Sequence, residues 1–143
     1  MATLKVRQLM RRDFPRAAPT DSVAKVRDLM YEHRIRHVPV LGPDRGILGL
    51  ASHRDLLRDA GIESYDRPVW IEDERLARLP ISEVMRTMVQ TVSPDDSAAA
   101  AGEVMLREKF GCLPVVEDDR VVGLLTEADF VRYVVAGPSD RLS

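Results

Sequence analysis

The sequence predicts a mixed α/β (α+β) fold made of two copies of one β-α-β-β-α unit. The first observation is an internal repeat: a shift of 75 residues places Pro39 over Pro114, and residues 6–11 over residues 81–86. The second is that each copy switches between helical and strand-like hydrophobic spacing. A unit of about 57 residues is marginal alone, so the copies are expected to pair about a pseudo-two-fold axis and share one core.

The repeat divides the chain into four parts. Residues 1–60 form the first repeat, residues 61–80 join it to the second repeat at 81–137, and residues 138–143 are a tail. The joining part carries Trp70 and several acidic residues. It can cover an edge of the core or meet a partner, and the sequence favours neither.

The elements follow in the same order within each repeat. Residues 6–11 form a short helical turn before an extended piece that ends at Pro19, because a proline disfavours helix in the residue before it. A helix opened by Ser22 follows, with apolar residues at helical spacing on one face. Two short strands then make a hairpin, and a closing helix ends the repeat. The expected ranges are residues 37–41, 47–50 and 54–59 in the first repeat and residues 112–117, 121–125 and 128–135 in the second.

Composition narrows the possible functions. The 143 residues are 45% hydrophobic and 31% charged, with a net charge of −2. This is ordinary for a soluble globular protein and argues against a nucleic-acid partner. No apolar run approaches the roughly 20 residues of a membrane span, and the N-terminal residues lack the apolar core of a signal peptide. We therefore expect a cytoplasmic protein with no membrane or nucleic-acid partner.

The reactive residue types show no catalytic or metal-binding spacing. Cys112 is the only cysteine, which excludes an internal disulfide and a cysteine-based zinc site. It falls in a predicted strand, where a small core residue is expected. His33, His37 and His53 have no metal-binding spacing with nearby carboxylates. We therefore predict no metal and do not expect an enzyme.

One motif recurs where the hairpin ends and the closing helix begins. A hydroxyl residue, Ser52 or Thr126, precedes an aspartate by three positions, Asp55 or Asp129. The pattern fits a capping box, in which the hydroxyl accepts a first-turn N–H and the acid bonds back to the cap N–H. It also fits a nucleotide cradle, with phosphate at the helix N-terminus and the carboxylate on the ribose hydroxyls. Both interpretations stay open at this point.

Four segments carry a resemblance to a known family: residues 35–40 (IRHVPV), 49–55 (GLASHRD), 111–116 (GCLPVV) and 123–129 (GLLTEAD). Together they resemble a tandem pair of cystathionine-β-synthase (CBS) domains, over nearly everything outside the joining part and the tail. The resemblance implies two repeats with a cleft on each side, and pairs that dimerise into a flat disk. It also implies adenosine-containing ligands, such as AMP, ADP, ATP or S-adenosylmethionine, in the clefts.

The resemblance further implies which residues meet the ligand. Backbone around the strand proline and just before Pro19 and Pro94 would flank the purine, the hydroxyls would meet phosphate, and the aspartates would hold the ribose. Placement on a sheet edge would explain the strand prolines equally well. In the first repeat the site residues are Ala17, Ala18, Arg36, His37, Val38, Pro39, Ser52, His53, Arg54 and Asp55. In the second repeat they are Val92, Ser93, Cys112, Leu113, Pro114, Thr126 and Asp129.

The two sites are expected to be unequal in charge. The first has arginine or histidine at four positions where the second has Gly111, Cys112, Glu127 and Ala128. Arginine–phosphate contacts are roughly twice as strong as neutral ones, so the first site is the better candidate for a nucleotide. Ordinary surface solvation would also explain Arg36. The alanines at positions 17 and 18 replace the β-branched pair usual in the family, which would loosen purine contact there.

The expected function is that of a stand-alone regulatory module. It would bind an adenine nucleotide (AMP, ADP or ATP) and signal the energy state to an effector protein that the sequence does not identify. The alternatives are a structural or interaction module with vestigial clefts, or a sensor of S-adenosylmethionine, NAD or a dinucleotide. A homodimer is expected, because apolar residues within 6–11, 81–86 and 131–135 would otherwise be left partly exposed.

Overall fold

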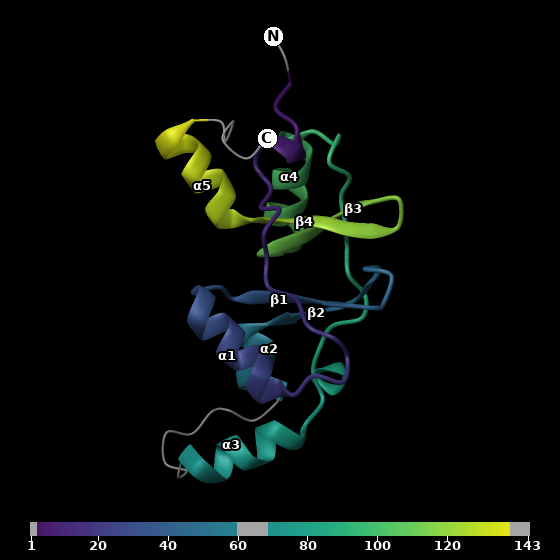
Figure 1. Ribbon diagram of the computed structural model, residues 1–143. Coiled ribbons are helices and arrows are strands. Elements are labelled where there is room, and N and C mark those ends of the chain that lie inside the picture. The colour runs from purple at the N-terminus through teal and green to yellow at the C-terminus, as the bar shows by residue number, and fades with distance from the viewer. Residues whose placement is uncertain (1–2, 60–68, 138–143) are drawn as a thin grey trace. The chain divides into compact units, whose positions relative to one another are not determined.

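The structure is a computed structural model that describes residues 3–59 and 69–137 (Figure 1). The mixed α/β class that the sequence predicts is confirmed. Two 3-10 turns, Val6–Gln8 and Ile81–Glu83, begin the two repeats. The other elements are α1 (Val23–His33), β1 (His37–Leu41), β2 (Ile47–Ser52), α2 (His53–Asp59), α3 (Val69–Arg78), α4 (Ala98–Glu108), β3 (Cys112–Glu117), β4 (Arg120–Thr126) and α5 (Glu127–Ala136).

The chain folds as two compact units that differ from the two sequence repeats. Residues 15–88 form one unit, here called the α1 unit, and residues 1–14 with 89–143 form the other, the α4 unit. The start of each sequence repeat therefore packs against the strands of the other repeat. Backbone hydrogen bonds of 2.9 and 3.0 Å join Arg86 to Leu50 in the α1 unit, and bonds of the same lengths join Arg11 to Leu124 in the α4 unit.

A glycine on each hairpin permits this exchange. A Cβ atom at Gly49 would lie 2.7 Å from the carbonyl oxygen of Arg86, and one at Gly123 would lie 3.0 Å from that of Arg11. Real Cβ atoms hardly ever come so close to backbone oxygen, so only a residue without Cβ lets the crossing segment pair here. The predicted helical turn at residues 6–11 accordingly shortens to three residues, because Arg11 is drawn into pairing with β4.

Each unit contains one antiparallel hairpin, β1–β2 or β3–β4, as the sequence predicts. The strand expected before Pro19 is a single parallel bridge: Ala17 donates to the Pro39 carbonyl at 3.0 Å and accepts from Leu41 at 2.9 Å. Prolines at positions 15, 19 and 39 have no N–H to extend this ladder, which explains its shortness.

The helix faces are buried as their spacing predicts. Ser22 caps α1 by accepting from the Lys25 N–H at 3.0 Å, and Ser97 caps α4 by accepting from the Ala100 N–H at 3.2 Å. A Cβ at Gly102 would lie 3.3 Å from the ring of Phe130, so α5 lies close against α4. The buried helix residues are Val23, Val26 and Met30 on α1 and Ala98, Ala101 and Met105 on α4.

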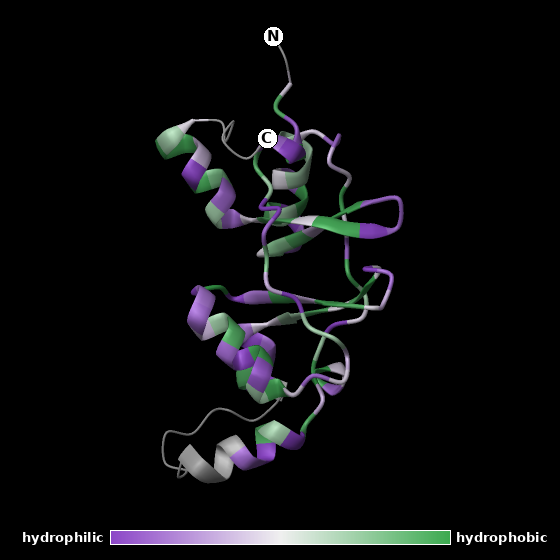
Figure 2. Cartoon of the chain, viewed as in Figure 1, coloured by the Kyte–Doolittle hydropathy of each residue, from purple (hydrophilic) through white to green (hydrophobic). Residues whose placement is uncertain are grey.

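Buried apolar side chains form two clusters, each within one unit. Figure 2 colours the chain by hydropathy, and hydrophobic segments occur in both units. The α1-unit cluster comprises Ala17, Val23, Val26, Met30, Val38, Val40, Ala51, Leu56, Leu76, Ile81 and Val84. The α4-unit cluster comprises Val6, Leu9, Met10, Ala98, Ala101, Met105, Leu113, Val115 and Leu125. The expectation that residues 6–11 and 81–86 keep apolar side chains exposed is therefore wrong, because the exchange buries them.

Helix α3 belongs to the α1 unit and is absent from the sequence-based prediction. Its Leu76 is fully buried in the α1-unit cluster, and the Val23 N–H donates to Leu79 just beyond the helix at 2.8 Å. The C-terminal end of the joining part therefore covers the core of this unit. The side chain of Trp70 lies outside the described residues. None of the helices in the described ranges is long and apolar enough to cross a membrane.

Candidate functional site

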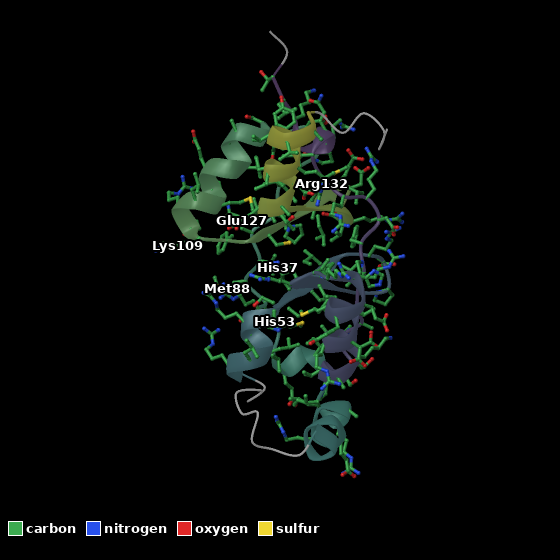
Figure 3. The ribbon with its side chains drawn as sticks, turned by 90° about the vertical axis from the view of Figure 1, so that its left-hand side faces the viewer. His37, His53, Met88, Lys109, Glu127 and Arg132 are labelled. Atoms are coloured by element: carbon green, nitrogen blue, oxygen red, sulfur yellow. The ribbon has the colours of Figure 1, made fainter. Side chains whose placement is uncertain are left out.

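In the α1 unit, Arg36, His37, Ser52, His53 and Asp55 gather at one end of the β1–β2 hairpin, whereas Ala17 pairs beside Val40, towards the turn. His37 lies opposite Ser52 in the register, and the His53 N–H donates to the Arg36 carbonyl at 2.8 Å. Figure 3 shows His37 and His53 in this unit. The hairpin therefore brings the start of β1 against the start of α2, as the resemblance implies.

Asp55 forms the capping box. The Asp55 N–H donates to Ser52 Oγ at 3.0 Å, and Asp55 Oδ2 accepts from the Ser52 N–H at 3.3 Å. Oδ1 accepts from Arg58 at 3.2 Å, and Arg86 Nε lies 3.7 Å from the same oxygen. Asp55 is only 1% exposed. A ribose at this carboxylate would therefore compete with arginines for Oδ1.

Arg86 and Arg58 were missed by the sequence-based choice of site residues. The repeat does show the signal for Arg58, since Arg132 recurs at the matching position after Asp129. Arg86 matches Arg11 in the same way, but its sequence neighbours belong to the second repeat. Only the exchange of segments places it beside Asp55.

Burial favours the neutral form of the His37 imidazole. Burial lowers the pKa of His37 below its ordinary value of 6.5, and the charges of Arg36 and Arg86 lower it further. The carboxylate of Asp55 opposes this shift without overcoming it. A neutral imidazole has one donor and one acceptor nitrogen, so it can bond to a ligand in either sense.

The backbone assigned to the purine already has partners inside the unit. The Pro39 carbonyl accepts from Ala17, and the Ala18 N–H donates to Asp21 Oδ2 at 2.8 Å. Val38 and Pro39 are buried. Purine contacts at these atoms would have to share carbonyls that are bonded already.

The α4 unit repeats this backbone. Val92 donates to the Pro114 carbonyl at 3.0 Å and accepts from Val116 at 2.8 Å, while the Ser93 N–H donates to Asp96 Oδ2 at 2.8 Å. Leu113 and Pro114 are buried. The two halves of the site set thus have the same backbone arrangement, here called the frame, in different units.

Thr126 and Asp129 make the second capping box, with shorter bonds. The Thr126 N–H donates to Asp129 Oδ2 at 2.8 Å, and Arg132 donates to Oδ1 at 2.6 Å. Asp129 is 2% exposed. The capping interpretation of the recurrent motif is therefore observed in both units, and the ribose contact stays a prediction.

Cys112 in the α4 unit corresponds to His37 in the α1 unit. Burial, and secondarily the charge of Asp129, raises the pKa of its thiol from 9.0 to about 12. A thiol that stays protonated is a poor nucleophile. This agrees with a small core residue. Among the described residues, no group of three or more His, Cys, Asp or Glu side chains could hold a metal ion.

The charge around the two frames differs. Arg36, His53 and Arg54 are exposed in the α1 unit, where the α4 unit has Gly111, Glu127 and Ala128. Arg86 adds a further cation beside Asp55. The α1-unit site is therefore suited to an anionic group, and the α4-unit site to a neutral or cationic one.

The fold is that of a tandem-repeat protein in which each repeat contributes a two-stranded hairpin followed directly by a helix. The model of the CBS domain family matches residues 6–60 and 81–136. The chain belongs to the CBS domain family, as the resemblance indicated, and is a pair of CBS domains.

Solved structures agree with this assignment. A Vibrio cholerae protein provisionally named for acetoin utilization (AcuB) is 34% identical, with a TM-score of 0.79, covering 94% of this chain and 92% of that one. A protein called CBSX2, solved in complex with AMP, is 24% identical with a TM-score of 0.76, covering 92% and 96%. The CBS domain pair of protein MJ0100, in complex with 5′-methylthioadenosine and S-adenosylmethionine, is 20% identical with a TM-score of 0.77, covering 94% and 98%. The last two likenesses show the fold alone.

Curated relatives are mostly longer proteins. An uncharacterized protein of Methanocaldococcus jannaschii is 27% identical over 94% of this chain, which spans 32% of its length. A homoserine O-acetyltransferase of Methanohalobium evestigatum is 26% identical over 79% of this chain, which spans 20% of its length. A CBS domain-containing protein of Bacillus subtilis, YhcV, is 24% identical, covering 87% of this chain and 81% of the relative.

Proposed function

We propose that this chain is a regulatory CBS-domain pair that binds an adenosine-containing ligand and passes the bound state to an effector protein. The observation that carries the proposal is the set of three arginines, Arg36, Arg54 and Arg86, whose segments lie at the end of the β1–β2 hairpin where β1 begins and β2 ends. Relatives of the same fold solved with AMP and with S-adenosylmethionine support it.

Each site residue has a proposed role in this binding. In the α1 unit, Arg36 and Arg54 would contact phosphate together with Ser52, and Asp55 would accept the ribose hydroxyls. The α4 unit, with Thr126 and Asp129 but fewer cations, would prefer a ligand without phosphate. Backbone at positions 17–18 and 38–39, and at 92–93 and 112–114, would flank the purine.

The test is a calorimetric titration with AMP, ADP, ATP, S-adenosylmethionine and NAD. A ligand that binds only the folded protein adds about 2.7 kcal/mol to stability at a hundred-fold excess over Kd, so the melting temperature should rise in parallel. R36Q should lower AMP affinity roughly ten-fold, the effect of losing about 1.4 kcal/mol from a charged hydrogen bond. E127Q is the matched control in the α4 unit and should leave AMP affinity unchanged.

The alternative function is a structural or interaction module whose sites are vestigial. Both Asp55 and Asp129 have their carboxylate oxygens bonded within the unit, which a purely structural role would explain. Failure of every ligand in the panel to bind or to raise the melting temperature at millimolar concentration would favour this alternative.

A homodimer also stays a proposal, now with one supporting surface. Val131, Val134 and Val135 on α5 are 63%, 82% and 81% exposed, and contiguous apolar patches mark interfaces. Light scattering of the wild type at micromolar concentration should give the dimer mass, and V134E should give the monomer mass.

A further inference from the structure

The contact between Arg86 and Asp55 is an ion pair without a hydrogen bond. Arg86 Nε lies 3.7 Å from Asp55 Oδ1, which is beyond the 2.7–3.2 Å of an N–H···O bond. The same oxygen already accepts from Arg58 at 3.2 Å. The Arg86 side chain is 51% exposed. Among the described residues, its guanidinium is therefore held near the site by charge, with donors left for another acceptor.

The backbone of Arg86 is fixed beside the site. Its N–H and carbonyl both pair with Leu50, two residues before Ser52 on β2, and Gly49 leaves room for that approach. A change of partner at this residue can therefore involve only the side chain. The flexible stem allows the guanidinium to turn from Asp55 while its Cα stays in place.

Two arginines besides Arg58 lie near the one carboxylate of Asp55. Arg86 lies at its Oδ1, and Arg36 directly precedes His37 in the chain. The charges of Arg36 and Arg86 reach His37, since both lower its pKa. An anion entering this region would meet uncompensated positive charge from two chain segments that are fifty residues apart.

We propose that Arg86 is an anion-binding residue of the α1-unit site, and that its guanidinium exchanges Asp55 for a phosphate of the bound nucleotide. This rests on the proposed function. Binding of the ribose hydroxyls to Asp55 Oδ1 would displace the weaker of its two arginines, and that arginine is Arg86. The released guanidinium would then bond to phosphate in the fork geometry that suits both. One ligand would thereby satisfy both partners of the broken ion pair.

The chain supplies a matched control at Arg11. Its backbone pairs with Leu124 by bonds of the same length as those between Arg86 and Leu50. Asp129, at the corresponding place, is held by Arg132 at 2.6 Å. Replacing Arg11 therefore removes an arginine from an equivalent crossing segment in the unit that has fewer cations.

The experiment is a calorimetric titration of the wild type, R86Q and R11Q with AMP and with adenosine, which lacks the phosphate. We expect R86Q to weaken AMP binding about ten-fold while adenosine affinity stays within two-fold, and R11Q to change neither. R86K keeps the charge without the planar fork, so it should recover part of the AMP affinity. In the ligand-free R86Q chain, the NMR-measured pKa of His37 should move upward.

The outcomes separate this inference from the proposed function. Equal ratios of AMP to adenosine affinity in R86Q and wild type would overturn the role of Arg86 and leave the proposed function standing. A wild type that binds neither compound would overturn both. Should R86Q fail to fold, R86K decides: a loss of affinity for AMP alone supports the role, and an equal loss for both compounds, or none, contradicts it.

Discussion

The α1 and α4 units share one frame and differ in what surrounds it. Both have a proline in the first hairpin strand, a glycine under the crossing segment, a capping box, and an arginine three positions after the buried aspartate. They differ at four positions around the hairpin end and in the presence of α3. The shared features are accounted for by folding alone. The differences are therefore where ligand preference is to be sought.

The largest expected effect concerns α3, which covers only the α1 unit. Leu76→Ala removes a fully buried side chain from that cluster, and such changes cost about 2–5 kcal/mol. Chemical denaturation should show this loss, and hydrogen exchange should locate it in the α1 unit. Leu106→Ala on α4 is the control, because Leu106 is 82% exposed and its loss should cost no more than about 0.5 kcal/mol. Equal effects would mean that α3 does not stabilise this unit.

The two glycines under the crossing segments, Gly49 and Gly123, should differ in how much stability a substitution by alanine costs. A new Cβ at position 49 would lie 2.7 Å from a backbone oxygen, against 3.0 Å at position 123. Overpacking of this kind costs about 1–3 kcal/mol, so Gly49→Ala should lower the melting temperature more than Gly123→Ala. Differential scanning calorimetry of the two variants measures the order. The reverse order would show that the Arg11 segment is the less adaptable one.

Loss of the capping box should cost more stability in the α4 unit than in the α1 unit, the reverse of the order expected for the glycines. Asp129 makes bonds of 2.8 and 2.6 Å where Asp55 makes bonds of 3.3 and 3.2 Å. The arginine partners, Arg58 and Arg132, are about half exposed. The expected cost is therefore near that of a lost cap: about 1–2 kcal/mol for Asp129→Asn and about 1 kcal/mol for Asp55→Asn. Urea unfolding of both variants checks this. Asp55→Asn should lower nucleotide affinity more than Asp129→Asn does. Unchanged affinity in both variants would show that the aspartates only cap their helices and do not contact the ribose.

Near neutral pH the smallest expected effect is a pH dependence of stability, which has opposite directions in the two units. His37 has a lowered pKa, so the unfolded chain binds more protons than the folded chain below pH 6.5. Stability should therefore fall as the pH drops, by at most about 1.4 kcal/mol for each pH unit. Cys112 has a raised pKa, so stability should fall as the pH rises above 9.0 towards 12. Thermal melts across pH provide the measurement. His37→Gln should flatten only the acid side, and Cys112→Ser only the alkaline side.

Local chemistry explains why much of the fold could be predicted from the sequence. The strands at residues 37–41 and 112–117 lie where β-branched runs between turns predict them, and Ser22 and Ser97 begin their helices as caps. These features depend on residues close in sequence. α3 has no such signal, because its burial depends on Leu76 meeting a core built by residues far away.

Sequence alone determined the repeat, the family and the recurrence of Ser52–Asp55 as Thr126–Asp129, since each is a pattern along one chain. Only the tertiary structure decided which partners these residues have. The start of each repeat pairs with the second hairpin strand of the other repeat, because Gly49 and Gly123 let backbone approach backbone there. That crossing puts Arg86 at Asp55, a contact between segments whose separation along the chain carries no information about their distance in space.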